Sequence, residues 1–270
     1  MAGAFAGGLL AALLPCNCVL CSASGAALLC PGCRDQFFRL HPPRCPICAN
    51  PLPPQPASPS ASGRAAPHAA RESAAASAPP AAQPPLASLV PCARCQSERP
   101  AFDATIVAAD YALPVDRLVL QLKFAGQLAL ARLFADLLAK AVKDNEATRP
   151  ALLCPVPLGM QRLAERGYNQ SLEIARPLGR QLGIALHAGL AVRVRETRAQ
   201  SSTPHGARHA NIAHAFAIPE RALVEGRHIG LVDDVMSSGQ TLQELAATLK
   251  RHGAARVTNY VFARTPPNTN

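Results

Sequence analysis

The stretch Leu231-Val232-Asp233-Asp234-Val235-Met236-Ser237-Ser238-Gly239-Gln240-Thr241 decides how this chain folds. Residues 228–232 are mostly apolar and predict a buried strand, which delivers the carboxylates of Asp233 and Asp234 to its C-terminal end. A bend of small, hydroxyl-bearing residues follows, and an amphipathic helix is expected over residues 241–251. An alternative interpretation is an acidic turn that only caps this helix, with Ser238 or Thr241 as the N-cap residue.

The bend is a candidate phosphate site. Backbone N–H groups of a bend and of the helix that follows it converge where a phosphate can sit. Ser237, Ser238 and Thr241 add hydroxyl donors, and Gly239 permits close approach or a positive φ. The neighbouring carboxylates are acceptors for hydroxyl groups, so a sugar phosphate would satisfy both halves of the segment. Neither G-x-x-x-x-G-K-[ST] nor G-x-G-x-x-G occurs, which excludes an ATP P-loop and a dinucleotide fingerprint.

Working outward from this segment, helical and strand patterns alternate along the second part of the chain. Apolar spacing predicts helices over residues 115–123, 127–142 and 169–182, and strands over 151–156 and 256–262. Pro177 is expected to kink or split the helix that contains it. Short apolar strands that alternate with helices predict an α/β fold with a mainly parallel sheet flanked by helices. Ligands of such sheets bind beyond the carboxyl ends of the strands.

A second polar cluster follows the strand at 151–156. Arg162 and Arg166 are i, i+4 neighbours if this segment is helical, so both could face one polyanion. Gly167 and Asn169 mark a turn into the next helix. We interpret the cluster as the side of the ligand cleft that lies opposite the bend and recognises pyrophosphate. A solvated basic helix face is the alternative.

A third segment, residues 195–211, is polar and has no apolar period. It is either a lid that closes over a bound ligand and excludes water, or an ordinary surface loop.

Cysteine spacing indicates metal binding in the first hundred residues. Eight of the ten cysteines form four Cys-x-x-Cys pairs, a spacing that lets two thiolates on one tight turn reach the same tetrahedral zinc ion. Disulfides and redox dithiols are the alternatives. We assign one site to Cys18, Cys21, Cys30 and Cys33, and the other to Cys45, Cys48, Cys92 and Cys95. A cross-braced pairing remains open. Cys16 and Cys154 lie outside the pairs and are interpreted as structural thiols.

Residues 49–91, rich in Pro, Ala and Ser, separate the two pairs of the second site and are predicted to be a disordered insert. Closing this 43-residue loop costs only about 1.5 kcal/mol more than closing an 8-residue one. A structural zinc site contributes roughly 10–16 kcal/mol, so the insert does not prevent one metal from joining both pairs.

Composition bounds the class of protein. The 270 residues are 49% hydrophobic and 16% charged, which excludes wholesale disorder, and no apolar run is long enough to span a bilayer. The formal net charge of +10 falls to +6 when two Zn(Cys)₄ sites of −2 each are counted, so the surface stays basic and favours polyanionic partners. The apolar N-terminus has no basic residue before Arg34. The missing signal-peptide n-region, together with reduced thiols, predicts a cytoplasmic protein.

The segment around the acid pair resembles the motif that binds phosphoribosyl pyrophosphate (PRPP) in type I phosphoribosyltransferases. That resemblance implies that Asp233 and Asp234 hold the ribose 2′ and 3′ hydroxyls. It also implies that Ser237, Ser238, Gly239, Gln240 and Thr241 hold the 5′-phosphate.

Taken together, the motifs resemble the ComF family of bacterial competence proteins over nearly the whole chain except residues 49–91. Besides the cysteine pairs and the acid-pair loop, the matching segments are Pro100-Ala101-Phe102-Asp103, Leu122-Lys123-Phe124, Pro155-Val156-Pro157, Arg166-Gly167-Tyr168-Asn169-Gln170, and Gln200-Ser201 with Arg208 and Asn211. The resemblance implies a double zinc ribbon over residues 1–100, a phosphoribosyltransferase-like domain over 101–270, and a role in DNA uptake during natural transformation. It adds Gln170, Gln200, Arg208 and Asn211 to the expected site.

Three functional hypotheses follow. The first is a Mg²⁺-dependent phosphoribosyltransferase whose acceptor is unidentified, in which Arg162, Arg166 and Mg²⁺ hold the pyrophosphate leaving group. The second is a non-catalytic protein that senses PRPP through the same cradle. The third is an adaptor of the DNA import machinery that contacts single-stranded DNA or the uptake helicase that the family implies.

Overall fold

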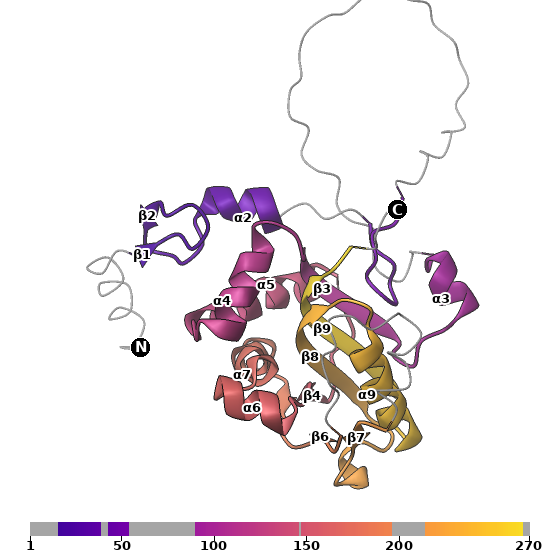
Figure 1. Cartoon of the computed structure of the whole chain (residues 1–270). Helices are drawn as coiled ribbons and strands as arrows, with labels where there is room; N and C mark the ends of the chain where they lie inside the picture. The colour runs from indigo at the N-terminus through magenta and orange to yellow at the C-terminus, as the bar shows by residue number, and fades with distance from the viewer. Residues whose placement is uncertain (1–15, 39–42, 54–89, 146, 196–213, 267–270) are drawn as a thin grey trace, which may run out of the picture.

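The computed structural model describes residues 16–38, 43–53, 90–145, 147–195 and 214–266 (Figure 1). The predicted insert therefore lies almost entirely outside the described residues. Most of the predicted lid, with Gln200, Arg208 and Asn211, does so too.

A five-stranded sheet organises the molecule. Its strands are all parallel and run in the order β3-β9-β8-β4-β5, which confirms the predicted fold class. Their bounds are Ala104–Asp110 (β3), Arg256–Arg264 (β9), His228–Met236 (β8), Leu152–Pro155 (β4) and Ala185–Leu186 (β5). The sequence patterns missed β3, although Thr105 to Ala109 are all buried. They also ended β8 too early, because its pairing with β9 continues through Asp233 and Met236.

Two short antiparallel pairs accompany the main sheet. One joins β1, Cys16–Asn17, to β2, Ser24–Gly25, and the other joins β6, Val192–Arg193, to β7, Phe216–Ala217.

Helices cover both faces of the sheet (Figure 1). On one face lie α4, Val115–Phe124, α5, Ala129–Asp144, and α7, Gln170–Leu182, whereas α9, Gln240–Arg251, covers the other. The shorter helices are α2, Pro31–Phe38, α3, Ala93–Ser97, α6, Met160–Arg166, and the 3₁₀ turn η2, Arg221–Leu223. In the described residues, no helix has the length and apolar character needed to cross a membrane.

The expected split of α7 at Pro177 does not occur, since the helix runs on to Leu182. A proline inside a helix costs about 3 kcal/mol. The helix buries Ile174, Leu178 and Leu182 in the core, and that burial offsets the cost.

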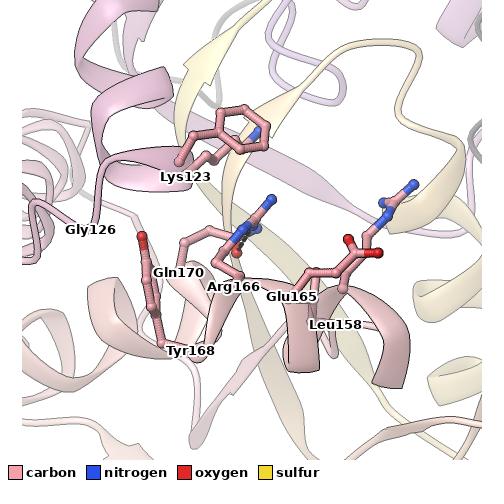
Figure 2. A pocket seen from close by; sticks show the side chains of 9 residues that line it. Lys123, Gly126, Leu158, Glu165, Arg166, Tyr168 and Gln170 are labelled. Atoms are coloured by element: carbon pink, nitrogen blue, oxygen red, sulfur yellow. Dashed lines mark hydrogen bonds between the residues drawn. The ribbon is translucent and has the colours of Figure 1, made fainter.

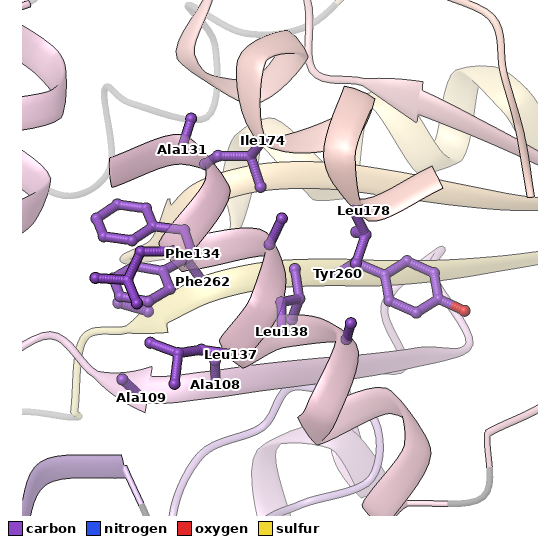
Figure 3. Close-up of a cluster of buried hydrophobic side chains, with 14 of the residues drawn as sticks. Ala108, Ala109, Ala131, Phe134, Leu137, Leu138, Ile174, Leu178, Tyr260 and Phe262 are labelled. Carbon is purple, nitrogen blue, oxygen red and sulfur yellow. The ribbon is translucent and has the colours of Figure 1, made fainter. Parts of the chain in front are cut away.

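Alternation along the central strands builds two cores. Tyr260 and Phe262 of β9 face α4, α5 and α7, whereas Val257 and Val261 face α9. In the first core the ring of Phe134 stacks on that of Phe262, with centroids 3.5 Å apart (Figure 3). Burial on both faces explains why these strands are almost continuously apolar.

The two cysteine modules pack on opposite faces of the sheet. Cys18, Cys33 and Phe38 join the core formed with α4 and α5, where the ring of Phe38 lies 6.3 Å from that of Phe262. Cys45, Cys48 and Cys95 join the core on the α9 side. The second module is further tied to β3 because Arg44 pairs with Asp110 (2.9 Å) and the Thr105 amide donates to the Pro46 carbonyl (3.2 Å).

Candidate functional site

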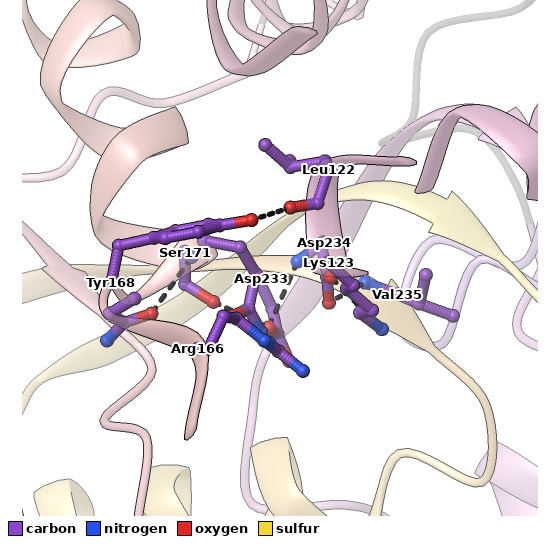
Figure 4. Close-up of polar contacts among 10 residues, drawn as sticks. Leu122, Lys123, Arg166, Tyr168, Ser171, Asp233, Asp234 and Val235 are labelled. Carbon is purple, nitrogen blue, oxygen red and sulfur yellow. Dashed lines mark hydrogen bonds and ion pairs between the residues drawn. The ribbon is translucent and has the colours of Figure 1, made fainter. Parts of the chain in front are cut away.

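The acid pair lies near the carboxyl end of β8, as the sequence predicts, but its carboxylates are buried. Asp233 is 9% exposed and Asp234 only 2%. The Ser171 hydroxyl donates to Asp233 Oδ1 (2.8 Å), and Lys123 Nζ lies 3.0 Å from Asp234 Oδ2 (Figure 4). A hydroxyl from α7 and an ammonium from α4 therefore stand where the sequence analysis expected sugar hydroxyls.

Burial has an electrostatic consequence at Asp233. Desolvation, and after it the adjacent charge of Asp234, raise the pKa of this carboxyl to about 7. The hydrogen bond from Ser171 and the charge of Lys123 oppose the shift. Carboxyl groups whose pKa is raised toward neutral pH by burial and by a nearby like charge are common in functional sites.

A cavity of about 580 Å³ is lined in part by Lys123, the partner of Asp234 (Figure 2). Its lining residues come from the end of α4, from α6 and from the start of α7: Lys123, Phe124, Gly126, Leu158, Arg162, Glu165, Arg166, Tyr168 and Gln170. Three of these are cationic and one is anionic, so the cavity suits an anion. Lys123 is both a wall of the cavity and the partner of Asp234, and it thereby connects the two.

The turn between α6 and α7 forms part of the cavity lining, and several contacts hold it in place. Gly167 ends α6 with a left-handed φ of 79°, and Asn169 caps α7 by accepting from the Ser171 amide (3.0 Å). Arg166 donates to the Gln170 side chain and lies over the Phe124 ring, 5.3 Å from its centroid. The Tyr168 hydroxyl donates to the Leu122 carbonyl, which ties the turn to α4 (Figure 4).

The predicted phosphate bend connects β8 to α9. Ser237 and Ser238 are exposed, and Gly239 precedes the helix with a φ of 79°. A Cβ at Gly239 would lie 2.6 Å from Met236 Cε, so the position favours glycine on two counts. Among the described residues, those of the bend do not line the cavity, and the contact between Lys123 and Asp234 joins the cavity to the acid pair that precedes the bend.

The structure gathers the eight paired cysteines into the two sequential groups rather than a cross-braced arrangement. Within each group the sulfur atoms all lie within 4.8 Å of one another, and the Sγ distances of Cys21–Cys30 and Cys48–Cys92 are 3.7 Å. A tetrahedral zinc ion with bonds of about 2.3 Å separates its sulfurs by about 3.8 Å, so the groups fit zinc. They support two structural zinc sites.

Backbone donors around each group favour thiolates. The Cys30 amide donates to Cys18 Sγ (3.4 Å), and the Cys92 amide donates to Cys45 Sγ (3.3 Å). A hydrogen bond with Cys48 lowers the pKa of the Cys45 thiol to about 4, although burial opposes the shift. Cys154 lies outside both groups, and burial raises the pKa of its thiol to about 12, as suits an inert structural cysteine.

Sequence reasoning missed two polar residues that meet the acid pair. In the sequence, Lys123 stands out only as part of the Leu122-Lys123-Phe124 motif, and Ser171 does not stand out. The i+2 spacing from the Asn169 cap was a weak signal for Ser171. Lys123 lies 110 positions before Asp233, and no local sequence pattern predicts a contact over that separation.

Comparisons with known proteins agree with this architecture. Residues 168–269 match the phosphoribosyl transferase domain, and residues 9–65 match the double zinc ribbon domain. DNA utilization protein YhgH of Escherichia coli K12 is 34% identical over 186 residues, which are 67% of this chain and 81% of that protein. Competence protein F of Haemophilus influenzae is 31% identical over 178 residues, 64% of this chain and 78% of that protein.

Among solved structures, glutamine PRPP amidotransferase from B. subtilis, complexed with ADP and GMP, matches with 17% identity and a TM-score of 0.34. The match covers 50% of this chain and 26% of that one. A similarity this low adds nothing to the assignment, which rests on the sequence relatives.

Fold, site and matches define a class of protein, in which a phosphoribosyl transferase domain carries a double zinc ribbon. Within that class the relatives are specific enough to assign a family. The chain belongs to the ComF family, together with DNA utilization protein YhgH and competence protein F.

Proposed function

We propose that this protein binds PRPP together with Mg²⁺ at the carboxyl end of β8. The observation that carries the proposal is the contact between Lys123 and Asp234, because it joins the acid pair of the strand to a cavity lined by cations. The phosphoribosyl transferase domain match covers the same strand and bend. A ligand with both sugar hydroxyls and several phosphates uses every part of this arrangement.

Each part of the site has a chemical counterpart in the ligand. The amides and hydroxyls of the Ser237–Thr241 bend would take the 5′-phosphate, and Asp233 and Asp234 would accept from the ribose hydroxyls. Arg162, Arg166 and Lys123 would hold the pyrophosphate group. Because Lys123 is partly exposed and Asp234 is not, Lys123 has to shift for a ribose to reach the acid pair.

When bound, Mg²⁺ would neutralise the pyrophosphate oxygens, and the acid pair offers the carboxylate oxygens that this ion prefers. In a transfer reaction the bond from C1 of the ribose to pyrophosphate breaks, and an acceptor nucleophile forms the new bond to C1. The arginines stabilise the departing charge. We further propose a cytoplasmic location, where zinc-binding thiols stay reduced.

Replacing the acid pair tests the proposal. In the Asp233→Asn/Asp234→Asn variant we expect PRPP affinity, measured by isothermal titration with Mg²⁺, to fall by at least about tenfold, because charge-assisted hydrogen bonds contribute roughly 1.5–3 kcal/mol each. The matched control is Asp144→Asn/Glu225→Gln, which removes two exposed carboxylates.

Long-range electrostatics predicts the opposite result, since removing two negative charges should strengthen binding of a polyanion. A loss confined to the site variant therefore identifies specific contacts. Equal affinity of wild type and site variant would remove the ribose-binding assignment.

A second candidate function is handling of single-stranded DNA, either by this protein alone or with an uptake helicase. It is favoured by the names of the relatives and by Phe124, which is 74% exposed beside Arg166 and could stack on a base. Binding through DNA phosphates would weaken steeply as the salt concentration rises. An affinity for a single-stranded oligonucleotide that does not change with salt would count against this function. Tight PRPP binding without release of pyrophosphate from PRPP, in the presence of any acceptor tested, would instead indicate a sensor.

A further inference from the structure

A buried arginine joins the second cysteine group to the bend. Arg264 is the last residue of β9 and is 4% exposed. Its Nε donates to the Cys48 carbonyl (3.1 Å), and its Nη1 donates to the carbonyls of Met236 (2.9 Å), Ser237 and Thr265 (2.7 Å). One guanidinium thus contacts a residue of the second cysteine group, the carbonyl of Met236 just before the bend and the carbonyl of Ser237, the first residue of the bend.

These contacts fix the direction of the bend's amides. In a trans peptide the C=O and the following N–H point in opposite directions. Because the carbonyls of Met236 and Ser237 face Arg264, the N–H groups of Ser237 and Ser238 face away from it. Both serines are exposed, so Arg264 turns two backbone donors toward solvent, where an anion can meet them.

The charge of Arg264 needs compensation. In the part of the chain that the structure describes, no carboxylate forms an ion pair with it, and its four acceptors are neutral carbonyls. Zinc with four thiolates carries a net charge of −2, so the loaded second group would place an anion beside Arg264.

We propose that Arg264 is a positioning residue through which zinc at the second cysteine group orients the bend for phosphate binding. The inference rests on the proposed function. The zinc–thiolate anion would lie beside the buried guanidinium and compensate its charge, and the guanidinium holds the two carbonyls. The first cysteine group packs on the other face of the sheet and serves as an internal control.

The first experiment separates the two tasks of Arg264 in the full-length, zinc-loaded protein. Arg264→Met removes both the charge and the donors, and we expect at least about a tenfold loss of affinity for PRPP with Mg²⁺. It should also speed the release of one of the two zinc ions to a chromophoric chelator about tenfold. Arg264→Lys keeps the charge but cannot span the carbonyls, so it should retain zinc within about twofold and still lose PRPP affinity.

The second experiment removes the metal instead of the arginine. Cys45→Ser/Cys92→Ser empties the second group, and Cys18→Ser/Cys30→Ser empties the first. We expect PRPP affinity to fall about tenfold more in the second-group variant than in the first-group variant. If a cysteine variant does not fold, the two Arg264 variants decide the question.

A readout without ligand separates failure of this inference from failure of the proposed function. The Thr265 amide donates to the Met236 carbonyl (3.0 Å), so its hydrogen exchange reports how firmly the bend is held. Exchange at Thr265 should accelerate about tenfold in Arg264→Met. If wild type binds no PRPP but this acceleration occurs, the proposed function fails and the coupling stands. Unchanged exchange, or release of both zinc ions at equal rates, overturns the inference.

Discussion

The acid pair shows how single residues set the character of this site. Asp233 and Asp234 are adjacent, buried and alike in charge, which is unfavourable unless something neutralises them. Lys123 provides the opposite charge at 3.0 Å from Asp234, and Ser171 donates a hydrogen bond to Asp233 at 2.8 Å. A site arranged in this way is held together by the same oxygens that a ribose ligand would use, so ligand binding and local stability compete for them.

The raised pKa of Asp233 predicts a pH-dependent cost to the fold. The ordinary carboxyl pKa is 3.8 and the folded value is about 7, so the folded state holds the proton more tightly, and stability falls as pH rises through this window. Asp233→Asn removes the charge. We expect its stability advantage over wild type to grow by roughly 2 kcal/mol between pH 5.5 and 8 and to level off above pH 7. Urea unfolding at several pH values measures it.

The exposed Asp144→Asn variant is the control for this measurement and should show no such trend. An advantage of Asp233→Asn that stays constant over the same pH range would contradict the raised pKa.

At the level of elements, the decisive unit is β8, the bend and α9. Parallel pairing of β8 with β9 brings Met236 opposite Arg264, and the same register sets the bend over the buried guanidinium. Gly239 then turns the chain into α9 with a positive φ. The strand, the bend and the start of the helix are therefore each held by a different interaction, and all of these interactions favour the same conformation.

Gly239→Ala should weaken this unit more than an equivalent change elsewhere. Gly167 also has a φ of 79° but has open space around it, so Gly167→Ala carries only the left-handed strain of about 1–2 kcal/mol. At Gly239 the new methyl must also displace buried Met236, and we expect at least about 1 kcal/mol of additional loss in urea unfolding. An equal loss of unfolding free energy at the two glycines would mean that the Met236 side chain moves aside without cost and would contradict the prediction.

At the scale of the whole molecule, the two cysteine modules pack on opposite faces of the sheet. Neither module packs only on itself, since their cysteines share the two cores with the strands and helices of the sheet. A zinc ribbon too small to bury its own core gains apolar partners in this way. The zinc sites therefore contribute to the stability of the phosphoribosyl transferase domain as well as to their own.

Phe38 tests this connection at the first module. It is 8% exposed and packs near Phe262, so Phe38→Ala should destabilise the protein by about 3 kcal/mol in chemical unfolding while two zinc ions remain bound. Phe124→Ala, which truncates a 74% exposed ring, should leave stability nearly unchanged. An unaltered unfolding midpoint for Phe38→Ala would show that the module contributes nothing through this contact.

Patterns with short range were readable from the sequence. The periods of the helices, the apolar strands, the acid pair with its glycine bend and the Cys-x-x-Cys spacings are all set within a few neighbouring residues, where local geometry dictates residue type. They predicted the α/β class and the place of the candidate phosphate site, and they indicated cysteine metal sites, whereas the structure decided between sequential and cross-braced cysteine groups. Pro177 does not split its helix because burial of the helix face outweighs a local penalty.

Only the tertiary structure decided which distant groups meet. Lys123 reaches Asp234 because α4 lies on one face of the sheet that contains β8. Arg264 reaches Met236 because β9 lies beside β8, and it reaches Cys48 because the second cysteine group packs against the sheet. The acid pair is buried because α7 lies over it. Contacts between residues a hundred or more positions apart depend on strand order and helix packing, which minimise buried charge and exposed apolar surface for the chain as a whole, and no local pattern encodes that balance.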